Sequence, residues 1–248
     1  MTHAMPFSGV ASRPFPGRVP GEAGSPGSFG ELTRAHRFGC SRGSVLKLEG
    51  DASCSVYFVI SGWLARSKFT ADGHRQIVDI SLPGDLLNPG SANPGLSAVQ
   101  VEALTYVKYA RVPRQEWRRL LATHPEIGQA FDRKAAAAVS RMSERILRLG
   151  KGSAESRIAY ALCEFCLLSS PAGLVERSMF HIPMSQQQLG DYCGLSAVHV
   201  CRTLRRFKSS GIIDVRAHMD VVIRDLDALA GIAEIDPATL PKEIICAA

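Results

Sequence analysis

The sequence contains no apolar run of eighteen residues, which excludes a membrane-spanning helix and hence a membrane partner. Nothing near its N-terminus joins a basic stretch to an apolar stretch of secretory length. Its seven cysteines are an odd number and lack the spacing of a disulfide framework. A chain of 248 residues also needs no such bridges to form a core. We therefore expect a cytoplasmic protein with reduced thiols.

Neither sign of charge dominates strongly. The chain has 29 Lys and Arg against 23 Asp and Glu, a net charge of +6 and a pI of about 9.1. Apolar residues make up 46% and charged residues 21%, values typical of a globular protein. The positive excess weakly favours a polyanionic partner.

The N-terminal half shows two patterns. Residues 1–30 contain five prolines and six glycines with little apolar periodicity, so we predict a flexible leader there. Residues 31–122 contain short β-branched and aromatic runs at 56–60, 63–69 and 76–80, separated by turn residues such as Asp72-Gly73. This pattern predicts hairpins of an antiparallel jelly-roll barrel.

A long helix is predicted over 123–150. Thr123-His-Pro-Glu126 resembles a capping box, apolar residues follow at steps of three and four, and Gly150 ends the pattern. An alanine tract keeps the centre slim, which favours close approach of a second copy. The predicted dimer contacts are Ile127, Phe131, Ala135, Ala138, Met142, Ile146 and Leu149. The alternative is a long helix that lies on its own barrel.

Residues 151–236 are predicted to form a winged helix-turn-helix, followed by a tail at 237–248. Two short helices flank a turn at 193–195, where Gly194 tolerates positive φ and Ser196 is placed to cap the second helix. At 100° per residue, Val200, Leu204 and Phe207 form the buried stripe of that helix. The runs 211–216 and 221–224 then predict the hairpin of a wing.

The outward face of the second helix is basic and carries no acid, which favours contact with double-stranded DNA. Arg202 is the best candidate for reading a base, because a guanidinium matches the O6 and N7 acceptors of guanine. The base-reading candidates are Val198, His199, Cys201 and Arg202. The phosphate-contacting candidates are Ser185, Gln187, Ser196, Arg205, Arg206 and Lys208. The alternative is a solvated basic helix face.

The segments 56–63 and 83–85 in the barrel, with 194–202 and 211–213 in the C-terminal part, resemble the Crp/Fnr family of bacterial transcription regulators. The resemblance covers about 31–236. It implies a homodimer that binds a near-palindromic operator and has RNA polymerase as a partner. Its two recognition helices would enter successive major grooves roughly 34 Å apart.

The sequence departs from the family's cofactor patterns. Relatives that bind cyclic AMP use a glutamate and an Arg-Ser/Thr pair, but this chain has Pro89 and Ser97-Ala98 there and no arginine between 75 and 111. Relatives with an iron–sulfur cluster use four cysteines, but only Cys40 and Cys54 lie nearby. His74 is typical of a solvated turn histidine rather than a haem ligand. We therefore expect no cofactor.

The remaining cysteines suggest redox chemistry at one place. Cys163 and Cys166 fall within a predicted helix and read as packed thiols, and no further residues complete a metal site with them. Cys193 and Cys201 are possible redox sites, because nearby arginines favour a thiolate; the alternative for Cys201 is a small side chain fitted close to DNA.

The predicted barrel lacks the residues of an active site. It offers only scattered acids and histidines, without metal-ligand or nucleophile–base spacing. The sequence therefore predicts a DNA-binding transcription regulator and not an enzyme. The alternative is a ligand or redox sensor that signals mainly through a partner protein.

Overall fold

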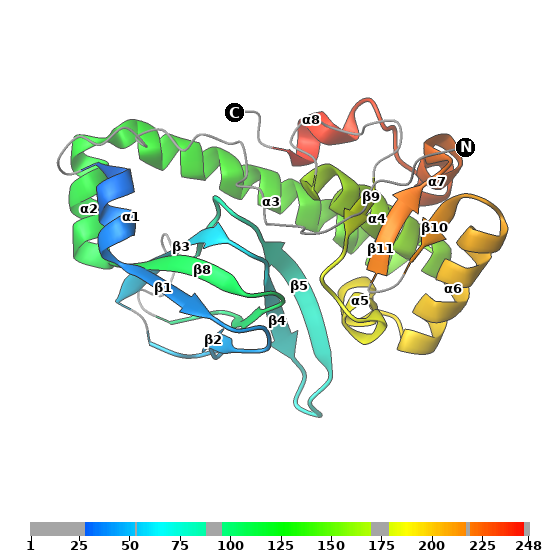
Figure 1. Cartoon of the computed structure of the whole chain (residues 1–248), viewed down its shortest axis with the longest axis horizontal. Coiled ribbons are helices and arrows are strands. Elements are labelled where there is room, and N and C mark those ends of the chain that lie inside the picture. Colours follow the sequence, from blue (N-terminus) through cyan, green and yellow to red (C-terminus); the bar gives the residue numbers. More distant parts are fainter. Residues whose placement is uncertain (1–27, 53, 88–95, 170–178, 217–218, 246–248) are drawn as a thin grey trace, which may run out of the picture.

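The computed structural model of the chain describes residues 28–52, 54–87, 96–169, 179–216 and 219–245. Two four-stranded antiparallel sheets form the N-terminal part, and several helices with a three-stranded sheet form the C-terminal part. The long helix α3, Pro125–Lys151, runs along both parts (Figure 1). The jelly-roll barrel, long helix and winged helix-turn-helix predicted from the sequence together define an α+β fold, and this arrangement confirms that class.

The N-terminal part is a jelly roll whose strands follow the order β1-β8-β3-β6 in one sheet and β2-β7-β4-β5 in the other. Strand β3 is buried on both faces: Val56 and Phe58 face one core cluster, and Tyr57 and Val59 face another. This explains its uninterrupted apolar run. The strands are β1 Arg37–Cys40, β2 Val45–Lys47, β3 Ser55–Ser61, β4 Leu64–Phe69, β5 Arg75–Ser81, β6 Leu86–Leu87, β7 Gln100–Ala103 and β8 Val107–Pro113.

Two glycine turns have different roles in the jelly roll. Strands β3 and β4 lie in different sheets, so the predicted hairpin between them is wrong. Gly62 passes the chain between the sheets with φ +88°, and a Cβ there would lie 2.4 Å from the carbonyl oxygen of Tyr106. By contrast, β4 and β5 pair across the Asp72-Gly73 turn, in which Gly73 has φ +83°. That hairpin is confirmed.

Two short helices, α1 Phe29–Ala35 and α2 Arg114–Thr123, pack beside the first sheet. Phe29 is buried, and its ring lies edge-on to Phe58 at a centroid distance of 4.8 Å. Ser28 caps α1. The predicted leader therefore ends too late, because its last three residues belong to the folded part; residues 1–27 lie outside the described ranges.

The predicted capping box before α3 is wrong. Thr123 is the last residue of α2, and its hydroxyl donates a hydrogen bond to the carbonyl of Leu120 at 3.0 Å. Helix α3 begins at Pro125 without a side-chain cap. Proline suits this position, because it has no backbone N–H that needs a partner.

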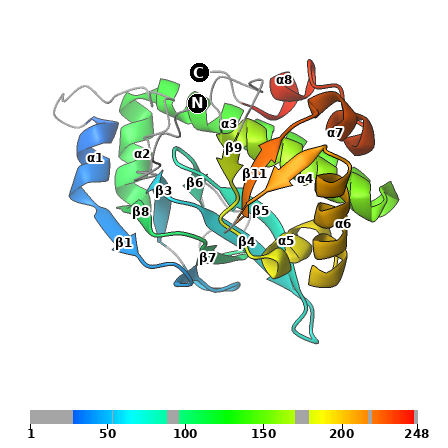
Figure 2. The ribbon, with the colours of Figure 1, turned by 45° about the vertical axis from the view of Figure 1, so that its right-hand side comes forward.

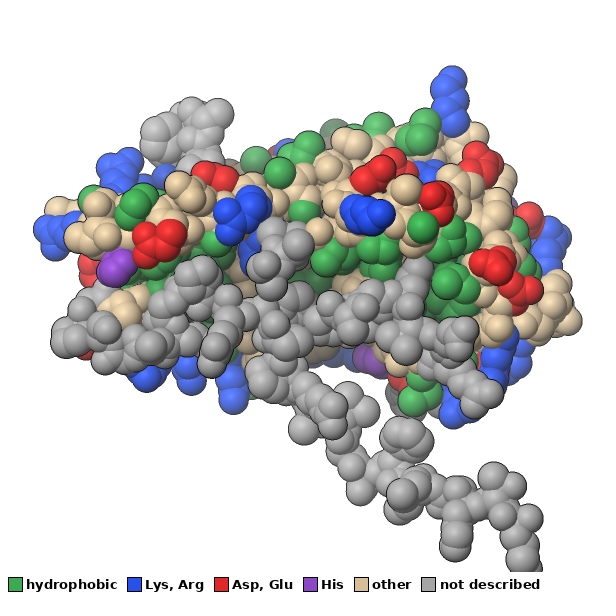
Figure 3. Space-filling view, turned by 90° about the horizontal axis from the view of Figure 1, so that it is seen from above, with side chains coloured by type: hydrophobic (Ala, Val, Ile, Leu, Met, Phe, Trp, Pro, Cys, Tyr) green, Lys and Arg blue, Asp and Glu red, His purple; other side chains and the backbone are tan. Residues whose placement is uncertain are grey.

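Helix α3 has an exposed apolar stripe opposite a buried face. Ile127 and Phe131 are buried in the protomer's own core, so their predicted role in a dimer contact is wrong. Val139 and Ile146 are 62% and 63% exposed. We call Ala135, Val139, Met142 and Ile146 the α3 stripe; they recur at steps of four and three. The space-filling view from above, onto the side of the molecule along which α3 runs, shows hydrophobic side chains interspersed with charged ones (Figure 3).

The C-terminal part has more structure than the sequence predicts. Strand β9, which the sequence pattern does not predict, completes a sheet of order β10-β11-β9. The predicted tail contains α8, which buries Leu240 and Ile244, so that assignment is wrong. The elements are α4 Ala154–Ser169, β9 Met179–His181, α5 Gln186–Cys193, α6 Ala197–Ser209, β10 Ile213–Val215, β11 Asp220–Ile223, α7 Leu226–Ala233 and α8 Leu240–Ile244.

The jelly roll and the C-terminal part share one hydrophobic core. Ile77 and Ile80 of β5 belong to the same buried cluster as Phe165 of α4 and Tyr192 of α5. Figures 1 and 2 both place the β4–β5 hairpin beside α5. Strand β5 of the jelly roll therefore packs directly against α5 of the C-terminal part.

Candidate nucleic-acid interface

Helices α5 and α6 form a helix-turn-helix whose three junctions are fixed by local chemistry. Ser185 and Gln188 make a reciprocal capping box at the start of α5. Gly194 ends α5 in the left-handed region with φ +64°, which an L side chain rarely adopts. Ser196 then caps α6 by accepting a hydrogen bond from the backbone N–H of His199 at 3.3 Å. These features confirm the predicted turn and cap.

Helix α6 presents a buried apolar face and an exposed basic face. Val200, Leu204 and Phe207 are buried, as predicted. Val198 is 65% exposed, and Arg202 and Arg205 are exposed on the same side. Neither arginine has a hydrogen bond or ion pair with any residue in the described ranges, so both guanidinium groups are available to a partner.

Several other predicted contact residues already have partners within the chain. Arg206 pairs with Glu155 of α4, and the Nζ of Lys208 lies 3.3 Å from Asp214. The side-chain amide of Gln187 donates to Asp191 at 2.9 Å. The other predicted residues lie at or near the same end of α5 and α6 and are exposed or half-buried: Ser185, Ser196, His199 and Cys201. DNA would therefore compete with internal partners for part of this set.

The wing brings two arginines that the sequence pattern did not predict as DNA contacts close to Lys208 of α6. Asp214 in β10 faces Lys208, Arg216 at 3.7 Å and Arg224 at 3.6 Å. The hydrogen bond from Lys208, with the charges of the three cations, lowers the pKa of Asp214. One carboxylate thus holds three positive groups beside α6, leaving a local excess of positive charge. The sequence contains a signal for these two arginines, because Arg216 and Arg224 each end one of the two runs predicted to form the wing hairpin.

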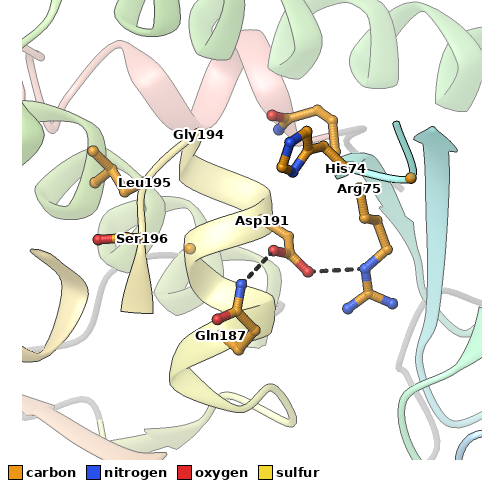
Figure 4. A pocket seen from close by; sticks show the side chains of 10 residues that line it. His74, Arg75, Gln187, Asp191, Gly194, Leu195 and Ser196 are labelled. Carbon is orange, nitrogen blue, oxygen red and sulfur yellow. Dashed lines mark hydrogen bonds and ion pairs between the residues drawn. The ribbon is translucent and has the colours of Figure 1, made fainter. Parts of the chain in front are cut away.

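A hollow of about 500 Å³ separates the β4–β5 hairpin from the helix-turn-helix (Figure 4). Arg75 crosses it: its Nε donates to Asp191 of α5 at 2.8 Å, and its Nη1 donates to Glu102 of β7 at 2.8 Å. Beside it, the side-chain amide of Gln76 donates to the backbone carbonyl of Tyr192 at 3.1 Å. The jelly roll therefore contacts the first helix of the DNA-binding unit directly.

Ser97 and Ala98, which stand where cyclic AMP-binding relatives have the Arg-Ser/Thr pair, make only contacts within the chain. Ser97 is buried, and its hydroxyl donates to the carbonyl of Val99 at 2.7 Å. The carbonyl of Ala98 accepts a hydrogen bond from Lys68. Pro89, aligned with the family's glutamate, lies outside the described ranges. A phosphate at this place would lack an arginine from the 76–110 segment.

The cysteines do not form a metal site or a reactive pair in the described part of the chain. No group of three His, Cys, Asp or Glu residues there could hold a metal ion. Cys193 is buried, and burial together with the nearby Glu164 raises the pKa of its thiol to about 12, which disfavours its predicted redox role. Cys201 is half-buried on α6, and its role stays a prediction.

Alkylation should distinguish these thiols. With its pKa raised in this way, the Cys193 thiol is almost entirely protonated at pH 8 and reacts slowly. We therefore expect iodoacetamide to modify exposed Cys54 readily and buried Cys193 only after unfolding, as measured by peptide mass spectrometry. Protein in denaturant provides the control. Equal rates at the two cysteines in the native protein would contradict the burial of Cys193.

Comparison with known families identifies the class. A model of the cyclic nucleotide-binding domain matches residues 39–124, and a model of the Crp-like helix-turn-helix domain matches residues 156–232. The chain belongs to the Crp/Fnr family of transcription regulators, which bind DNA and act as dimers. It is therefore a DNA-binding transcription regulator and not an enzyme. The alternative of a sensor signalling mainly through a partner protein is not favoured.

Particular relatives agree with this assignment. The chain is 28% identical to the transcriptional activator protein FnrA of Stutzerimonas stutzeri, over 77% of this chain and 78% of that protein. It is 29% identical to the nitrogen fixation regulation protein FixK of Bradyrhizobium diazoefficiens, over 75% and 77%. The structure of FixK2 from Bradyrhizobium japonicum superposes with a TM-score of 0.69 at 24% identity, covering 79% of this chain and 96% of that one. Across the described ranges, no helix is both long and apolar enough to cross a membrane.

Proposed function

We propose that the protein binds a near-palindromic operator as a homodimer and reads its sequence mainly through Arg202. The exposed, unpaired guanidinium of Arg202 on the outward face of α6 carries this proposal. Val198 beside it presents methyl groups suited to the C5-methyl of thymine.

The phosphate contacts are assigned by availability. Arg205 has no partner in the described part of the chain and is the leading phosphate contact, whereas Arg206 must first leave Glu155. The wing cations Arg216 and Arg224 extend the positive surface beyond α6. Contacts of this kind set the position of the protein on the duplex rather than its sequence preference.

The sensor part is proposed to work without cyclic AMP, an iron–sulfur cluster or haem. A buried cyclic phosphate needs a cation or several donors. The Ser97-Ala98 segment has no arginine, its hydroxyl donates to the carbonyl of Val99, and the neighbouring Lys68 pairs with Glu49. Regulation would follow from recruitment of RNA polymerase by the dimer on its operator, in the cytoplasm where the DNA lies.

Selection of bound duplexes from a random pool tests the proposal most directly. We expect enrichment of two inverted half-sites whose centres lie about one helical turn, roughly 34 Å, apart. Failure to enrich any sequence at low salt would overturn the proposal, and a single asymmetric half-site would overturn its dimeric form.

Alanine substitutions then separate base reading from phosphate contact. Arg202→Ala should weaken binding to the selected duplex by about 1–3 kcal/mol, or roughly 5- to 150-fold, and relax selection at one base pair in each half-site. Arg205→Ala should weaken specific and random duplexes alike and reduce the salt dependence of binding. Equal losses on both duplexes for Arg202→Ala would contradict base reading.

A further inference from the structure

Charged side chains are buried where the jelly roll, α3 and the DNA-binding unit meet. Asp79 of β5 is 0% exposed, and its Oδ1 lies 2.7 Å from the Nη2 of Arg145 in α3. Its other oxygen pairs with Arg66 of β4. Burial lowers the pKa of Arg66 to about 10, so this arginine remains charged at neutral pH. The junction therefore contains real charges rather than neutral polar groups.

The same network continues into the helix-turn-helix. Glu164 of α4 is also 0% exposed; its Oε1 lies 3.7 Å from the Nε of Arg145, and its Oε2 accepts a hydrogen bond from the hydroxyl of Tyr192 at 2.7 Å. The guanidinium of Arg145 also lies over the ring of Tyr192, 4.7 Å from its centroid. We call Asp79, Arg145, Glu164 and Tyr192 the buried relay. It connects a strand of the sensor to the first helix of the helix-turn-helix.

A second connection joins the same two elements near the surface. Arg75 at the start of β5 binds Asp191 of α5 (Figure 4), and the side-chain amide of Gln76 donates to the carbonyl of Tyr192. Strand β5 thus holds α5 at two points, one through solvent-accessible groups and one through the buried relay. Two separated contacts restrict the orientation of α5 relative to β5 as well as the distance between them.

Buried ion pairs are poor sources of stability, because the cost of removing charges from water offsets their attraction. An arrangement that separates the partners, however, leaves a buried charge unpaired, which is strongly unfavourable. A shift of β5 relative to α5 would do this at Asp79 and at Glu164. The relay is therefore better suited to select one orientation of the two parts than to stabilise the fold.

We propose that Asp79, Arg145 and Glu164 are positioning residues that hold α5, and through it α6, at one orientation relative to the sensor. The proposal rests on the proposed function, because its consequence is measured on the operator. In a dimer, the orientation of α6 decides how far apart the two recognition helices lie. Loss of the relay should therefore impair simultaneous binding to two half-sites and leave contact with one half-site intact.

Asp79→Asn tests this with little change in side-chain volume. The measured quantity is the ratio of affinities for the full selected duplex and for a duplex with one half-site scrambled. We expect this ratio to fall at least about tenfold, because the second half-site no longer meets its helix. Affinity for the single half-site should stay within about twofold of wild type, since α6 itself is unchanged. Asp79→Glu should restore part of the ratio by returning the charge.

The matched control is Asp227→Asn, the same change at an exposed position of α7 outside the relay. It should leave the ratio unchanged. A folded, dimeric Asp79→Asn variant that keeps the wild-type ratio would overturn the proposal. If Asp79→Asn fails to fold, Tyr192→Phe removes only the hydroxyl that binds Glu164 and should lower the ratio in the same direction; an unchanged ratio there also overturns it.

Failure of the proposed function would look different. If the wild-type protein selects no duplex, the relay can still be tested by small-angle X-ray scattering of the free protein. Asp79→Asn should then broaden the distribution of interatomic distances, because the two parts move relative to each other, and Asp227→Asn should not. Identical scattering from wild type and Asp79→Asn would overturn the positioning role independently of DNA.

Discussion

Val139→Glu or Ile146→Glu should convert the dimer into monomers. Both side chains lie in the exposed α3 stripe, and a two-fold contact through this stripe would bring two introduced carboxylates together without partners. We expect monomers at micromolar concentration in analytical ultracentrifugation. Affinity for the full duplex should fall at least about 100-fold, because the two half-sites are no longer bound by one molecule.

Gln129→Glu provides the control for this prediction. It introduces the same charge at an exposed α3 position off the stripe, so it should leave the dimer and the affinity for the full duplex unchanged. A dimeric Ile146→Glu variant with wild-type affinity would show that another surface forms the dimer.

Gly190→Ala should disrupt the helix-turn-helix. Gly190 is buried in α5, and a Cβ there would lie 2.4 Å from the backbone carbonyl oxygen of Leu195 in the turn. Because a backbone atom cannot swing aside as a side chain does, α5 and the turn must separate, at a cost of about 2–3 kcal/mol or more. We expect a lower unfolding midpoint and loss of specific binding, measured by thermal unfolding and by titration with the selected duplex.

Gly231→Ala makes the identical change in α7, where nothing lies within 4 Å of the new Cβ. It should stabilise the protein slightly, by about 0.5–1 kcal/mol, because alanine favours a helix over glycine. A Gly190→Ala variant as stable as Gly231→Ala would contradict the close approach of α5 and the turn.

The sequence predicts the helix-turn-helix well because local rules define it. The buried stripe of Val200, Leu204 and Phe207 follows from helical periodicity, and the turn follows from Gly194 and Ser196. The exposure of Arg202 follows from the same periodicity. Local rules do not predict which of these cations have an ion-pair partner. Arg206 is paired and Arg205 is not, because the tertiary fold brings Glu155 of α4 next to Arg206.

Helix α3 shows the limit of the same reasoning. Periodicity identifies the apolar residues of α3 but not the surface that each of them contacts. It therefore predicts Ile127 and Phe131 in the dimer contact, whereas both pack in the core of their own protomer. It also favours solvent for arginines, whereas Arg141, Arg145 and Arg148 are buried. Arg141 faces Glu164, and Arg145 faces both Glu164 and Asp79; these carboxylates lie on other elements of the chain. Nothing in the local pattern of α3 announces such partners.

The core that β5 shares with α4 and α5 limits how this regulator exchanges parts with its relatives. A chimera that joined its sensor and α3 to a foreign DNA-binding unit would expose Ile77 and Ile80 and leave Arg145 without Glu164 unless the foreign helices supplied a replacement. Neither half is therefore a self-contained unit that can be exchanged alone. The two halves share a core through β5, so an exchange between relatives that moves both halves together keeps this core intact.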